Sequence, residues 1–194
     1  MQTKNSFKNK KSLGQNFINS PKIIEKIINP AEITPADTVL EIGPGTGTMT
    51  SMILERARKV VTIEKDDRLI PILKEKFERE VLNKKLEIVH GDFLEVDLDK
   101  NGLKEGEFKV VANIPYYITG QIVRRLLENH PRPKMIVLTV QKEVAERIVA
   151  KDGKESLLSL SVKAFGQPKY IETIRRGNFT PIPNVDSAVL LISD

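Results

Sequence analysis

The chain has 194 residues, 40% hydrophobic and 29% charged, which predicts one globular domain with a sizeable core. It has no cysteine and only two histidines, so disulfides and thiolate metal sites are excluded and we expect no metal. The sequence shows no apolar run of transmembrane length and no signal peptide, so we expect a soluble, cytoplasmic protein without membrane contact.

The net charge is +5, and the basic residues gather toward the two ends of the chain. Residues 1–11 form an acid-free arm, and further basic residues lie beyond residue 120; the candidates are Lys8, Lys10, Lys11, Arg124, Arg125, Arg175 and Arg176. This distribution suits a polyanion such as RNA. Solvated side chains on an ordinary surface explain the charge equally well.

A compact polar and aromatic segment at residues 12–18 follows the arm. It precedes a helix whose isoleucines at 23, 24, 27 and 28 share one face. From the residues alone, Asn16 and Phe17 could cap and staple that helix and do nothing more.

The stretch at residues 38–47 reads as strand, tight turn and helix start, because a short apolar run ends in Gly43, Gly45 and Gly47. Glycines let backbone approach a ligand closely, and their spacing matches neither the dinucleotide fingerprint nor the P-loop. Glu41 places a negative charge beside the turn, which suits an amine or a positive centre better than a phosphate. A purely structural turn is the alternative.

Short apolar runs then alternate with helical patterns. Strands are predicted at 59–64, 86–90, 108–112, 134–140, 170–174 and 188–192, and helices at 66–77, 121–129, 141–150 and 155–166. This alternation predicts an α/β fold with a parallel sheet covered on both faces.

In such a sheet, ligands bind at the carboxyl ends of the strands, which here read Gly43, Glu64, Asp92 and Asn113. Glu64, about twenty residues past the glycine turn, is placed to bind ribose hydroxyls. Asp92 can accept a hydrogen bond from an exocyclic amine, and Phe93 can pack on a purine ring. Each acid alone could be a helix cap, but four such residues at successive strand ends predict a nucleoside-like ligand.

The sequence Asn113-Ile114-Pro115-Tyr116 predicts chemistry on an aromatic amine, whose lone pair is delocalised into its ring. The Asn113 side-chain oxygen and the Ile114 carbonyl could hold its two hydrogens and align the lone pair with a methyl donor. Pro115 stiffens the turn, and Tyr116 offers a face for stacking. Catalysis would then rest on positioning and electrostatics, while a structural turn is the alternative.

These motifs together resemble the ribosomal RNA adenine N6-dimethyltransferases. The resemblance runs from about residue 10 to residue 192, on Gln15-Asn16-Phe17, residues 41–47, Glu64, residues 91–93, 113–116 and 179–187. It implies a Rossmann-like class I methyltransferase fold with a seven-stranded, mostly parallel sheet whose last strand is antiparallel, and S-adenosylmethionine as methyl donor.

The resemblance also implies residue roles. The donor-binding set is Gln15, Asn16, Ile18, Gly43, Gly45, Gly47, Glu64, Asp92, Phe93 and Asn113. Asn113, Ile114, Pro115 and Tyr116 would act on the target adenine. Phe179, on a proline-stiffened loop, could be the second face of a base sandwich with Tyr116, and a core phenylalanine is the alternative.

The small-subunit branch, which dimethylates two adjacent adenines, is more similar than the macrolide-resistance branch that acts on large-subunit RNA. We expect a monomer that binds ribosomal RNA in a small-subunit precursor. Residues 12–194 would form the methyltransferase domain, and the small helical domain that usually follows would be absent. A DNA adenine methyltransferase and a non-catalytic ribosome-assembly module are the alternatives.

Overall fold

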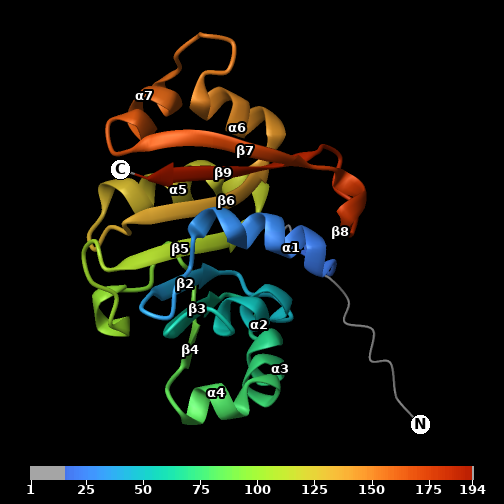
Figure 1. Ribbon diagram of the computed structural model, residues 1–194, viewed down its shortest axis with the longest axis vertical. Helices are drawn as coiled ribbons and strands as arrows, with labels where there is room; N and C mark the ends of the chain where they lie inside the picture. The colour runs from blue at the N-terminus through green and yellow to red at the C-terminus, as the bar shows by residue number, and fades with distance from the viewer. Residues whose placement is uncertain (1–15, 194) are drawn as a thin grey trace.

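A seven-stranded sheet forms the centre of the computed structural model, which describes residues 16–193 (Figure 1). The strand order is β4-β3-β2-β5-β6-β9-β7, and β9 runs opposite to the other six strands of this sheet. The strands are β2 (Thr38–Ile42), β3 (Lys59–Glu64), β4 (Leu86–His90), β5 (Phe108–Asn113), β6 (Met135–Gln141), β7 (Gln167–Ile174) and β9 (Ser187–Ser193). The predicted sheet and the direction of its last strand are confirmed.

Helices cover both faces of this sheet. They are α1 (Pro21–Ile28), α2 (Thr48–Leu54), α3 (Leu69–Lys76), α4 (Glu78–Leu82), α5 (Thr119–Glu128), α6 (Lys142–Val149) and α7 (Leu157–Lys163). Successive β2 side chains point to opposite faces, so Val39 joins the core beneath α1 and α2 while Leu40 joins the core beneath α5 and α6. Since β2 is buried on both faces, it reads as a nearly continuous apolar run.

The helix predicted at 66–77 begins three residues later, at Leu69. Asp66 makes a turn instead, because its carboxylate accepts the backbone N–H of Arg68 at 3.2 Å and Nε of Arg68 at 2.8 Å. Pro71 therefore falls in the first turn of α3, where its missing N–H has no intrahelical partner to lose.

A second, two-stranded sheet joins segments far apart in the sequence. Antiparallel β1 (Phe17–Ile18) pairs with β8 (Phe179–Thr180), with Phe17 opposite Thr180. The capping role considered for Asn16 and Phe17 is not observed, since α1 is preceded by Ser20 without a side-chain cap. The ladder instead brings the start of the described chain to residues 179–180.

Candidate functional site

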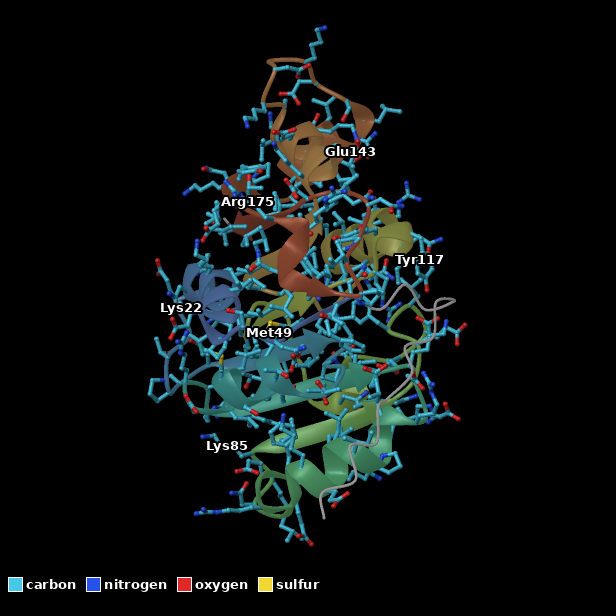
Figure 2. The ribbon with its side chains drawn as sticks, turned by 90° about the vertical axis from the view of Figure 1, so that its right-hand side faces the viewer. Lys22, Met49, Lys85, Tyr117, Glu143 and Arg175 are labelled. Carbon is cyan, nitrogen blue, oxygen red and sulfur yellow. The ribbon has the colours of Figure 1, made fainter. Side chains whose placement is uncertain are left out.

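A cleft of about 270 Å³ lies at the carboxyl ends of β2, β3 and β5. In Figure 1, the β9 arrow points to the left, where the C-terminus lies. The parallel strands run the opposite way and end on the right, which is the side that faces the reader in Figure 2. The predicted residues that line the cleft are Asn16, Gly43, Gly45, Glu64, Asp92, Phe93, Asn113, Ile114, Pro115 and Tyr116. The structure therefore gathers most of the predicted site residues that it describes.

Several predicted residues lie elsewhere. Ile18 lines a separate cavity of about 40 Å³ behind the glycine turn, and Gly47 and Phe179 line neither space. The predictions for Gln15, Lys8, Lys10 and Lys11 fall outside the described residues.

The glycine turn requires its glycines. Gly43, Gly45 and Gly47 have φ of +67°, +60° and +75°, a region that other residues seldom adopt. A Cβ on Gly45 would stand 2.6 Å from the Phe17 ring, and one on Gly47 would stand 2.5 Å from the Phe77 ring. At Gly43 the same position is open space on the cleft, so backbone and ligand can approach closely there.

Glu64 ties the end of β3 to the glycine turn. Its Oε2 accepts the backbone N–H of Gly45 at 3.1 Å, and its Oε1 accepts that of Asp66 at 2.8 Å. Burial raises the pKa of this carboxyl, while the backbone donors act in the opposite direction. Each oxygen keeps a further lone pair, so the predicted bond from a ribose hydroxyl remains compatible with this geometry.

Asp92 is held by two donors at the rim of the cleft. Its Oδ1 accepts the backbone N–H of Leu94 at 3.0 Å, and its Oδ2 accepts Nζ of Lys65 at 2.6 Å. The bond from Lys65 holds the pKa of Asp92 below its ordinary value. Lys65 was missed by the sequence reasoning, although its place directly after Glu64 at a strand end is a signal that could have identified it.

Arg125 has a structural role, which corrects its prediction as an RNA-binding residue. Its Nη1 donates to the Leu94 carbonyl at 2.9 Å, its Nη2 donates to the Val96 carbonyl, and its guanidinium lies 5.4 Å from the centre of the Phe93 ring. These contacts brace the loop that carries Asp92. The neighbouring Arg124 turns outward with its side chain 75% exposed.

Asn113 is oriented by a segment nearly one hundred positions away. Its Nδ2 donates to the Asn16 backbone carbonyl at 2.7 Å, which fixes the plane of the amide and leaves Oδ1 as an acceptor. Tyr116 shares a hydrogen bond of 2.6 Å with the buried Ser187 hydroxyl. Burial raises the pKa of Tyr116, so its phenol stays neutral.

Phe179 is a core residue in this structure, which is the alternative considered for it. Its side chain is 1% exposed and packs in the core with Ile18 and Ile24. Because β8 pairs with β1, the ring is buried instead of facing the base. The predicted sandwich with Tyr116 is therefore not formed.

Glu41 also differs from its prediction. It is fully buried, its Oε2 accepts the Thr50 hydroxyl at 2.6 Å, and its Oε1 has no hydrogen-bond partner among the described residues. Burial raises the pKa of this carboxyl to about 8, so it is protonated and neutral at pH 7. The negative charge predicted beside the glycine turn is absent at that pH.

Within residues 16–193, no group of three or more histidine or acidic side chains is placed to hold a metal ion. Over the same range, no helix is long and apolar enough to cross a membrane.

Known proteins share both sequence and fold with this chain. The model of the family described as ribosomal RNA adenine dimethylase matches residues 6–193. A relative from Dehalococcoides mccartyi (strain CBDB1), named ribosomal RNA small subunit methyltransferase A, is 41% identical over 187 residues, covering 96% of this chain and 63% of the relative. A crystal structure of a dimethyladenosine transferase from Plasmodium falciparum matches with a TM-score of 0.80 and 36% identity, covering 91% of this chain and 62% of that one. The crystal structure of the 23S rRNA methyltransferase ErmE also has a TM-score of 0.80, with 34% identity, covering 92% and 69%.

This chain thus spans less than two thirds of the length of the first two of these proteins. The structural matches confirm the predicted Rossmann-like class I methyltransferase fold. From the family match over nearly its whole length, the chain belongs to the ribosomal RNA adenine dimethylase family.

Proposed function

We propose that the protein transfers methyl groups from S-adenosylmethionine to the N6 amine of adenine in ribosomal RNA, dimethylating two adjacent adenines of the small subunit. The observation that carries this proposal is one cleft in which Gly43, Glu64 and Asp92 adjoin Asn113 and Tyr116. The names of the family and of the Dehalococcoides relative support the RNA substrate and the subunit.

The residues of the cleft fit this donor. The open space at Gly43 admits a ligand against bare backbone, Glu64 keeps lone pairs for ribose hydroxyls, and Asp92 can accept the amine of an adenine ring. When bound, the donor would supply a methyl group on a positively charged sulfur, an electrophile that needs no metal or acid. Ile18 and Gly47 remain proposed donor contacts although they do not line the cleft, and the proposal for Gln15 concerns a residue outside the described range.

The target amine would be oriented by fixed acceptors. Since Nδ2 of Asn113 is anchored on Asn16, its Oδ1 can accept one amine hydrogen while the Ile114 carbonyl accepts the other. Two such bonds would hold the amine with its lone pair aligned on the methyl donor, and the electron density that they push onto the nitrogen would raise its nucleophilicity. Tyr116 would hold the base by stacking, with its ring fixed through Ser187.

The remaining partner assignments are also proposals. A target adenine must leave its stack to enter the cleft, either by flipping or because the RNA is single-stranded there. The exposed Arg124, Arg175 and Arg176 are the described candidates for phosphate contacts. We propose a cytoplasmic protein. We also propose that it acts as a monomer, because residues of one chain line the cleft.

Two measurements test this function. Calorimetry should show binding of S-adenosylhomocysteine, and labelled donor should transfer methyl groups to immature small ribosomal subunits. Large subunits serve as a second substrate, because the 23S enzyme has the same TM-score as the dimethyladenosine transferase. Donor binding without transfer to either subunit would favour the non-catalytic alternative, and preferential large-subunit transfer would reassign the target.

A further inference from the structure

Lys65 occupies the rim of the cleft, between the donor side and solvent. Its Nζ lies 2.6 Å from Oδ2 of Asp92, and its side chain is 58% exposed while that of Asp92 is mostly covered. Tyr117, which is labelled in Figure 2, is 62% exposed and lines the same cleft, and it acts electrostatically on the Lys65 ammonium. Lys65 therefore lies where ligand and solvent meet.

This ion pair uses the acceptor that the proposed donor needs. Oδ1 of Asp92 accepts the Leu94 backbone N–H and Oδ2 accepts Lys65, so an incoming adenine amine would have to share this carboxylate with Lys65. Both are donors, and sharing one carboxylate weakens each bond. Ion pairs as exposed as this one change a binding equilibrium constant by about fivefold at most, so breaking the Lys65–Asp92 pair costs little free energy.

We propose that Lys65 exchanges partners during the reaction cycle: it neutralises Asp92 before the donor binds, and then contacts an RNA phosphate once the donor's adenine amine has taken its place. The proposal rests on the proposed function, because it takes the donor's adenine at Asp92 and the RNA at the same cleft. The freed ammonium would remain beside Tyr117, on the cleft that also holds Asn113 and Tyr116.

Such an exchange links the two ligands thermodynamically. If donor binding releases one lysine for a phosphate, then donor raises RNA affinity and RNA raises donor affinity by the same factor. One additional phosphate contact also steepens the plot of log affinity against log salt by about 0.7 for single-stranded RNA.

Donor binding alone gives the first test. In Lys65→Met the competitor for Asp92 is gone, so S-adenosylhomocysteine should bind about two- to fivefold more tightly by calorimetry at low salt. Lys65→Arg restores the competing cation and should bind like the wild type. Lys22→Met is the matched control, since Lys22 is an exposed lysine on α1, away from Tyr117 in Figure 2, and should also leave the affinity unchanged.

The linkage gives the second test, with a small-subunit RNA fragment as titrant. Wild type and Lys22→Met should bind this RNA a few-fold more tightly with S-adenosylhomocysteine present and show the steeper salt dependence. Lys65→Met should lose both effects. Equal or weaker donor binding by Lys65→Met, or undiminished linkage in it, would overturn the exchange and leave the proposed function standing. Failure of the wild type to bind S-adenosylhomocysteine would overturn both.

Discussion

Arg125→Met should destabilise the protein and weaken donor binding, although the residue lies outside the cleft lining. The substitution removes two hydrogen bonds from the guanidinium to the Leu94 and Val96 carbonyls, and its contact with the Phe93 ring. The loop braced by these contacts carries Asp92. A less rigid loop should therefore lower the affinity for S-adenosylhomocysteine.

The expected magnitude follows from those contacts. Each charged hydrogen bond contributes about 1.5–3 kcal/mol, and the cation–π contact about 0.5–1 kcal/mol. Water can partly replace the lost donors because the site is only half-buried. The buried Nε of Arg125, which has no hydrogen-bond partner within residues 16–193, would no longer incur a desolvation cost. Methionine keeps much of the apolar stem. We therefore expect the free energy of unfolding to fall by about 1–3 kcal/mol.

Urea unfolding of the two adjacent arginine variants is the assay. Arg124→Met removes the same side chain from an exposed position and should change the unfolding free energy by less than about 0.5 kcal/mol. Arg124→Met should instead lower RNA affinity. Equal stabilities for the two variants, or unchanged donor affinity in Arg125→Met, would refute the bracing role of Arg125.

Three further predictions concern Phe179, the glycine turn and Glu41. Phe179→Ala should lower the unfolding free energy by about 3–5 kcal/mol in urea titrations, because the ring is buried in the core. A stable variant with slow turnover would instead support the hypothesis that Phe179 and Tyr116 stack on the target base. Gly47→Ala should lower the thermal midpoint more than Gly43→Ala, since both sites have a positive φ but only at Gly47 would the Cβ meet the Phe77 ring. Gly43→Ala should weaken donor binding more, because Gly43 lines the cleft; the reverse order of either effect would contradict this assignment. The folded-state pKa of Glu41, about 8, exceeds its ordinary value of 4.5, so unfolding releases its proton and the stabilisation present below pH 4.5 is lost as the pH rises to about 8. Relative to Glu41→Gln, the wild type should therefore lose up to about 1.4 kcal/mol per pH unit in that window, and parallel pH profiles would refute a neutral Glu41.

The strands and their meeting ends could be predicted because buried parallel strands leave a strong pattern. β3 begins and ends at the predicted residues, and its last residue, Glu64, lies on the cleft as expected. The Asn113 turn follows the same logic, since a polar residue after a buried strand lies at the sheet edge.

Long-range contacts account for the predictions that differed. Periodicity placed Arg124 and Arg125 together on the polar face of α5, and nothing local shows that the loop at 92–96 passes over only one of them. Phe179 is buried by its pairing with the other end of the chain. Glu41 is neutral because β2 is covered on both faces, a property of the whole sheet.

Nucleoside analysis of small-subunit RNA after incubation with donor, at low salt, tests the central claim most directly. The wild type should produce N6,N6-dimethyladenosine at two adjacent adenines. Asn113→Ala, which loses the acceptor proposed to orient the amine, should bind S-adenosylhomocysteine within about tenfold of the wild type yet form product slower by orders of magnitude. Dimethyladenosine formed by Asn113→Ala at the wild-type rate, or methyl groups found at another atom of the RNA, would contradict the account.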